Sequence, residues 1–135
     1  MESKIKTPGE IVEYDGKELP LFEDVVDSGE REEFDTGSVR DTRDGKGRYD
    51  LVSSIGLRRL ALHYENGAKK YGEHNWELGQ PVSRYLDSGI RHFFKYLRGL
   101  RDEDHLAASA WNAFAAIHTI QKVADGELPK ELDDV

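Results

Sequence analysis

Three residues in the second half of the chain, Arg84, Asp87 and Arg91, are spaced by three and four positions. On a helix, this spacing places their side chains on one polar stripe. The stripe borders an apolar face, where charged groups are costly unless they are paired or used. The pattern indicates either an ion-pair lattice at a subunit interface or a site for an anionic ligand, and His92 stands directly beside it.

A second polar stripe follows further along the chain. His105, Ser109 and Asn112 are spaced by four and three positions, and Asp104 precedes them. Such a stripe on an alanine-rich helix is typical of hydrogen bonds between helices, and Asp104 is equally typical of a helix N-cap. The alternative is that these groups face a bound ligand.

Two residue pairs suit either a structural or a functional role. Glu65 and Lys69 are four positions apart, which fits a surface ion pair or a metal-binding carboxylate beside a phosphate-binding lysine. Asn75 and Trp76 fall in a polar loop. There an amide and an indole can read and stack on a nucleobase, or the indole can cover the core.

A glycine-flanked lysine precedes the first expected helix. Lys46 lies between two glycines and Arg48 follows it. Flexible backbone with two cations suits a phosphate chain. The spacing is not that of a Walker A loop, and no Ser or Thr follows the lysine. The alternative is therefore a turn in which Arg48 pairs with a nearby aspartate.

Together, these features favour a metal ion and a polyphosphate. The chain contains no cysteine, so its carboxylates favour a hard cation such as Mg²⁺ or Mn²⁺. Basic side chains beside such an ion favour a polyphosphate ligand.

Helices are the elements that must position these residues. We expect one helix from Ser53 or Ser54 to Gly72, one from Ser83 to Gly99, and one from the acidic cluster at 102–104 to Gly126. No window alternates at the period of a strand. The predicted fold class is all-α, a set of antiparallel helical hairpins.

The spacing of apolar residues also predicts which helix faces are buried. The predicted faces are Leu57, Ala61, Tyr64, Ala68 and Tyr71; Leu86, Ile90, Phe93 and Leu97; and Leu106, Ala110, Ala113, Ile117, Ile120 and Ala124. Three short helices enclose little core, so we expect a homodimer or homotetramer. The many alanines of the third helix suit either tight packing within one chain or a bundle between two chains.

The charge distribution divides the chain. It has 135 residues and a net charge of −8, and all of the excess acid lies in residues 1–45. We therefore expect an irregular acidic N-terminal arm at 1–36 and a helical domain at 37–135. The absence of a basic excess argues against nucleic-acid binding. No apolar run is long enough for a membrane span or a signal peptide, so we expect a cytoplasmic protein.

Several short motifs together resemble one protein family. They are GKGRYDL at 45–51, LRRL at 57–60, HYENGAKKYG at 63–72, NW at 75–76, SRYLD at 83–87, RH at 91–92, DEDHL at 102–106 and WN at 111–112. Over about residues 37–120, the chain resembles the phage-associated dATP/dGTP diphosphohydrolases. It is more distantly similar to the MazG-like all-α nucleotide pyrophosphohydrolases.

The resemblance implies both an activity and an assembly. A purine deoxynucleoside triphosphate, dGTP or dATP, would be cut between its α- and β-phosphates, giving the monophosphate and pyrophosphate. In phages that replace adenine with 2-aminoadenine, such an enzyme makes dGMP from dGTP. The MazG-like fold works as intertwined dimers or tetramers with Mg²⁺ or Mn²⁺, and two or three ions in each site are expected.

The metal ligands cannot be carried over by motif. Typical MazG-like chains carry an E-E-x-x-E helix followed by E-x-x-D, and this combination does not occur in residues 37–135. By helix face and chemistry, the candidate metal ligands are Glu65, Asp87, His92 and Asp104. The candidate catalytic residues are His105 and Arg91. The candidate nucleotide- and phosphate-binding residues are Lys46, Arg48, Lys69, Asn75, Trp76, Arg84 and Asn112.

Two other functions are weighed against this one. An acidic phage protein can act as a non-catalytic DNA mimic or host inhibitor, but the helical region is neutral overall, whereas a mimic spreads acid along its helices. A phosphohydrolase that needs an adjacent His-Asp doublet is disfavoured, since the chain contains no such doublet.

Overall fold

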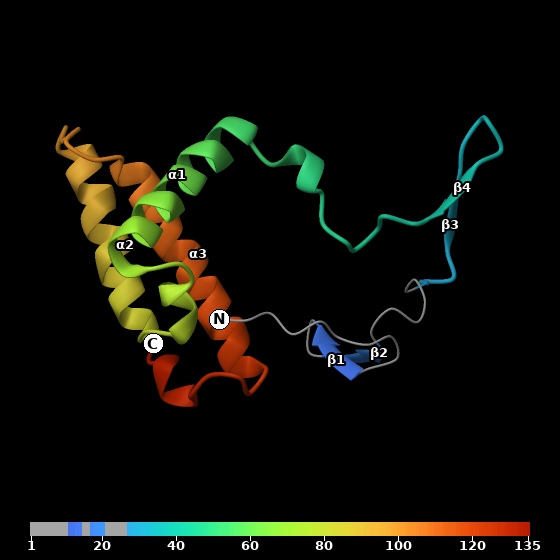
Figure 1. The fold of residues 1–135 in the computed structure, drawn as a ribbon. Coiled ribbons are helices and arrows are strands. Elements are labelled where there is room, and N and C mark those ends of the chain that lie inside the picture. The colour runs from blue at the N-terminus through green and yellow to red at the C-terminus, as the bar shows by residue number, and fades with distance from the viewer. Residues whose placement is uncertain (1–10, 15–16, 21–26) are drawn as a thin grey trace. The chain divides into compact units, whose positions relative to one another are not determined.

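The computed structural model describes residues 11–14, 17–20 and 27–135. These residues fall into two units, of which one ends at Tyr49 and the other runs from Asp50 to Val135. Figure 1 shows strands in the first unit and helices in the second. None of the helices in the described part of the chain is long and apolar enough to cross a membrane.

The N-terminal unit contains two antiparallel hairpins. Strand β1 (Ile11–Tyr14) pairs with β2 (Lys17–Pro20), and β3 (Arg31–Glu33) pairs with β4 (Val39–Asp41). Sequence periodicity did not predict these strands. In the second hairpin, Arg31 lies opposite Asp41 and Glu32 lies opposite Arg40. Such cross-strand charge pairs stabilise a hairpin. Strand prediction relies on alternating apolar residues, and this hairpin lacks them.

Three α-helices dominate the second unit, as Figure 1 shows, so the all-α prediction is confirmed. Helix α1 is Ser54–Tyr71, α2 is Val82–Leu97 and α3 is His105–Ala124. Short 3₁₀ turns are η1 (Tyr49–Leu51), η2 (Asn75–Leu78) and η3 (Lys130–Leu132). The boundaries of the three α-helices lie within a few residues of those predicted from caps and glycines.

The helix ends follow local hydrogen-bonding chemistry. The Ser53 hydroxyl caps α1 by accepting a hydrogen bond from the Gly56 N–H at 3.0 Å. Asp104 caps α3 by accepting from the Ala107 N–H at 3.1 Å. Ser83, predicted to cap α2, lies inside that helix. Its N–H donates to Asp134 at 2.9 Å, so a carboxylate near the C-terminus takes the capping role.

Small residues bring α2 and α3 together. A Cβ atom added at Gly89 would lie 3.2 Å from the Cβ of Asn112, so the two helices approach closely at this point. The buried residues of α3 include Ala107, Ala108, Ala115, Ala116 and Thr119. Four of the alanines predicted to permit a close helix contact therefore pack within one chain.

The faces predicted to be buried are largely exposed in the single chain. On α2, the buried residues are Val82, Tyr85 and Gly89, whereas Leu86, Ile90, Phe93 and Leu97 are 39%, 56%, 49% and 64% exposed. On α3, Ile117 is 66% exposed. The core prediction was wrong for a single chain, because no helix of the described residues covers these larger apolar side chains.

Candidate active site

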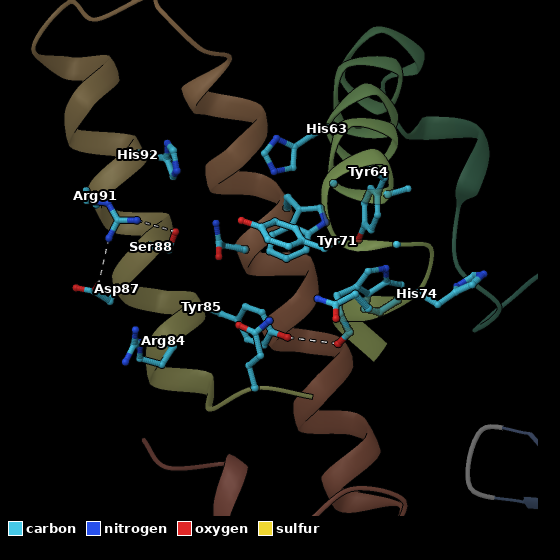
Figure 2. A pocket seen from close by; sticks show the side chains of 18 residues that line it. His63, Tyr64, Tyr71, His74, Arg84, Tyr85, Asp87, Ser88, Arg91 and His92 are labelled. Carbon is cyan, nitrogen blue, oxygen red and sulfur yellow. Dashed lines mark hydrogen bonds and ion pairs between the residues drawn. The ribbon is translucent and has the colours of Figure 1, made fainter. Parts of the chain in front are cut away.

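A cleft of about 510 Å³ opens between the three helices of the second unit. Residues from α1, η2, α2 and α3 all contribute to its lining, and Figure 2 shows their side chains around one space. Ligand-binding clefts commonly have volumes of about 300–1,000 Å³. The cleft is therefore large enough for a nucleotide-sized molecule.

One side of the cleft is aromatic. The Tyr64 ring lies edge-on to Trp76 at 5.8 Å and to Trp111 at 6.0 Å between ring centroids. Tyr85 meets Trp111 at 6.0 Å, and His63 meets it at 5.6 Å. These rings join α1, η2, α2 and α3, and they form a surface on which a flat heterocycle can stack.

The opposite side of the cleft is basic. Figure 2 shows Arg84, Asp87 and Arg91 projecting from α2, across the cleft from His63 and Tyr64 on α1. Arg91 donates to the Asp87 carboxylate at 3.4 Å and to the Ser88 hydroxyl at 3.2 Å. Within the described part of the chain, no carboxylate pairs with the Arg84 guanidinium. An unpaired guanidinium in a cleft is well suited to bind phosphate oxygens.

A histidine cluster stands beside the basic side. The Nδ1 atoms of His92 and His105 lie 2.9 Å apart, and Nε2 of His105 lies 2.8 Å from Oδ1 of Asp102. His92 lines the cleft, whereas the His105 ring is fully buried behind it. Ligand atoms of His92, Glu103 and His105 all lie within 4.8 Å of one another, which is close enough to hold one metal ion.

Burial affects the protonation of two histidines that line the cleft, His92 and His63. It lowers the pKa of His92 below its usual value, although the nearby Glu103 carboxylate acts in the opposite direction. Burial likewise lowers the pKa of His63. Both imidazoles are therefore neutral at neutral pH, with a lone pair available. The hydrogen bond from His105 lowers the pKa of Asp102, so that this carboxylate stays ionised.

Seven of the residues singled out from the sequence line the cleft. They are Asn75, Trp76, Arg84, Asp87, Arg91, His92 and Asn112. The Asn112 side chain donates from Nδ2 to the Ala108 carbonyl at 2.8 Å, which fixes the amide within α3. Trp76 lies edge-on to His118 at 4.7 Å between ring centroids, so its indole also packs against α3.

The other candidates lie elsewhere. Glu65 and Lys69 are exposed on α1 and do not line the cleft. His105 reaches the cleft only through His92. Asp104 accepts hydrogen bonds from Arg59 at 2.6 and 2.7 Å in addition to capping α3. Lys46 and Arg48 belong to the N-terminal unit.

In that unit, Lys46 pairs with Asp41 at 2.8 Å. The helical unit does not gather the four candidate metal ligands into one group. Asp87 and His92 line the cleft, whereas Glu65 and Asp104 do not.

Sequence reasoning missed several residues of the site. Asp102 and Glu103 had been assigned only to a helix start, although Asp102 and His105 have the i, i+3 spacing of a paired carboxylate and imidazole. Tyr64 had been assigned to a buried apolar face, and Trp111 was noted only as part of a motif. Neither spacing nor composition distinguishes an aromatic core residue from one that lines a cleft.

One protein family matches most of the chain. The family is described as dATP/dGTP diphosphohydrolase, N-terminal, and its model matches residues 36–127. This range contains every residue that lines the cleft and all three members of the histidine cluster. No curated protein and no solved structure matches the chain significantly.

Proposed function

Because the chain belongs to the dATP/dGTP diphosphohydrolase family by its N-terminal domain, we propose that it hydrolyses a purine deoxynucleoside triphosphate to the monophosphate and pyrophosphate. The reaction requires a divalent ion, Mg²⁺ or Mn²⁺, and takes place in the cleft of the helical unit. The preferred substrate is dGTP, with dATP as the second candidate, and the role is to remodel the nucleotide pool of a phage-infected cell.

The observation that carries this proposal is the division of the cleft into an aromatic side and a basic side. A purine is a wide, flat heterocycle, and Tyr64, Trp76 and Trp111 provide rings from three elements, α1, η2 and α3. Asn75 and Asn112 add amide groups able to read the edge of the base or the sugar.

The triphosphate is assigned to the basic side. Arg84 supplies a guanidinium with no carboxylate partner among the described residues, and the one carboxylate contact of Arg91 there is the 3.4 Å contact to Asp87, beside a 3.2 Å hydrogen bond to Ser88. A phosphate chain can replace that weak contact with shorter, charge-assisted hydrogen bonds. Lys46, Arg48 and Lys69 remain candidate phosphate contacts, but the proposal does not require them.

Hydrolysis between the α- and β-phosphates breaks one P–O bond. The oxygen of a water molecule attacks the α-phosphorus, and pyrophosphate leaves with the bridging oxygen. When bound, a divalent ion neutralises phosphate charge and lowers the pKa of the attacking water. Arg84 and Arg91 stabilise the charge that develops on the transferred phosphate. Asp87 is the carboxylate that lines the cleft, and we assign it to the ion that arrives with the nucleotide.

A second copy of the chain is the proposed partner of the exposed apolar stripe on α2. Leu86, Ile90, Phe93 and Leu97 form a continuous row at helical spacing, and each is at least 39% exposed. Light scattering should give at least twice the chain mass, and Ile90→Lys should reduce it to one chain. Val39→Lys is a control with the same 56% exposure in the other unit. A monomeric wild type would refute the assembly.

Pyrophosphate release from the eight common NTPs and dNTPs, with Mn²⁺, Mg²⁺ or EDTA, tests the activity. We expect metal-dependent release from dGTP or dATP, with the monophosphate as the second product. Arg84→Gln should lower kcat/KM on the order of 10²-fold, as for loss of one transition-state donor. Arg98→Gln removes an exposed arginine that follows the same helix outside the cleft, and it should leave turnover intact.

Absence of release from every nucleotide with either metal would refute the enzyme. The protein would then fall into the class of non-catalytic binding modules.

A further inference from the structure

We infer that His92, Glu103 and His105 form a built-in site for one divalent ion of the late first transition row, Mn²⁺ to Zn²⁺, which binds before any nucleotide arrives. The inference deepens the proposed function by adding a resident ion at the edge of the cleft. It rests on the proposed function only for that ion's role in turnover, because binding itself needs no substrate.

The donor atoms already converge on one point. The two Nδ1 atoms are 2.9 Å apart, and a carboxylate oxygen of Glu103 lies within 4.8 Å of a ring nitrogen of each histidine. Two imidazoles on one ion at right angles, with bonds of ~2.1 Å, have nitrogens ~3.0 Å apart, whereas a tetrahedral pair is ~3.4 Å apart. The observed separation fits neighbouring positions of a six-coordinate ion, which leaves room for water or phosphate oxygens.

Asp102 prepares His105 for this role. It receives the Nε2–H of His105 at 2.8 Å, so the lone pair of that ring is left on Nδ1, the atom that faces His92. Ligating histidines characteristically donate their second ring nitrogen to a carboxylate in this way. The His105 ring is fully buried, so it cannot turn away.

A simple hydrogen bond between the two histidines is the competing explanation. In that case, Nδ1–H of His92 would donate to Nδ1 of His105 at the same distance. This explanation gives Glu103 no function, although its carboxylate lies within reach of both rings.

The donor set selects among metals. Mg²⁺ takes oxygen ligands and keeps its waters, so two imidazole nitrogens and one carboxylate exclude it from this position. Imidazole suits Fe²⁺, Co²⁺, Ni²⁺ and Zn²⁺, and affinity rises along the row from Mn²⁺ towards Ni²⁺. We therefore expect Ni²⁺ and Co²⁺ to bind more tightly than Mn²⁺, with no competition from Mg²⁺.

The test is metal binding by the full chain, without a histidine tag, after treatment with EDTA and with no nucleotide present. Titration calorimetry with Ni²⁺ should give one ion per chain. Visible absorption of the Co²⁺ protein should show the weak bands of a six-coordinate centre. Glu103→Gln, an exposed change, should weaken Ni²⁺ binding at least 10-fold, and Asp102→Asn should weaken it 10- to 100-fold.

Glu77→Gln is the matched control. The Glu77 carboxylate also lies beside a histidine, 3.1 Å from Nδ1 of His74, but outside the cluster. This variant should bind Ni²⁺ as the wild type does, whereas His92→Gln should lose binding. Circular dichroism of each variant separates lost metal binding from lost folding.

Absence of Ni²⁺ binding, or binding unchanged in both Glu103→Gln and His92→Gln, would overturn the inference. The pyrophosphate assay distinguishes this failure from failure of the proposed function. Nucleotide hydrolysis without binding at the cluster would refute only the metal site. Binding at the cluster without hydrolysis would refute only the enzyme.

Discussion

Asp104 offers a sharp test of whether a carboxylate near the site is structural or catalytic. It was a candidate metal ligand from its sequence context, but in the structure it accepts from the Ala107 N–H at 3.1 Å and from Arg59 at 2.6 and 2.7 Å. Since both oxygens are occupied, we predict that Asp104 acts as a helix cap.

The size of the effect follows from the capping role. Replacing an N-cap aspartate by alanine costs ~1 kcal/mol, within a range of ~0.5–2, whereas asparagine caps about as well as aspartate. For a domain of this size, ~1 kcal/mol shifts Tm by ~4–8 °C. Asp104→Ala should therefore lower Tm by about that amount. Asp104→Asn should lower Tm by less than half as much, since it removes only the half-exposed ion pair with Arg59.

Thermal melts followed by circular dichroism, with pyrophosphate release on the same samples, would decide the matter. Arg59→Met provides the control for the ion pair alone and should resemble Asp104→Asn. Equal losses of Tm in Asp104→Ala and Asp104→Asn would refute the cap. A fully folded Asp104→Asn variant without turnover at saturating metal would return Asp104 to the list of metal ligands.

Two further predictions concern packing and acid stability. Gly67→Ala should raise stability by ~1 kcal/mol through helix propensity, because no atom of the part of the chain that the structure describes lies within 4 Å of the added Cβ. In thermal melts, Gly89→Ala should lack that gain, because its Cβ would meet Asn112 at 3.2 Å; an equal gain would refute the close contact of α2 and α3. The hydrogen bonds from Ser83 lower the pKa of Asp134 below its usual 3.8. The unfolded chain therefore binds the proton more readily, so this contribution is complete well above pH 3.8 and is lost as pH falls below it. Acid unfolding curves of Asp134→Asn should show a smaller loss than those of the wild type, and identical curves would contradict the assignment.

Helix positions were predictable because they depend on local chemistry. Ser53, Gly72 and Asp104 mark helix ends through groups that each act within a few residues. The family was predictable for a related reason, since short motifs spread over the helical region match one family, and the comparison confirms that resemblance. The stripe of Arg84, Asp87 and Arg91 follows from helical spacing alone, and all three residues line the cleft.

Other features depend on contacts that no periodicity encodes. The hairpin of β3 and β4 carries charged residues opposite each other and has no apolar alternation. The buried face of α2 is made by Val82, Tyr85 and Gly89, because the close approach of α3 favours a glycine over the larger residues of the predicted stripe. Glu103 lies near two histidines but stands in the loop before α3, and helical spacing does not extend into loops.

The two sides of the cleft differ in mechanical stiffness. The arginine side belongs to α2, which is fastened to α3 by close packing at Gly89 and by Val82 and Tyr85 in the buried core. The aromatic side depends partly on α1, where Leu60 is the one buried residue and is still 6% exposed. Elements with few buried contacts open at lower free energy. Amide protons of α1 should therefore exchange with solvent sooner than those of α3. The arginines assigned to the phosphates would then be held rigidly, whereas the aromatic side assigned to the base could move when a nucleotide binds.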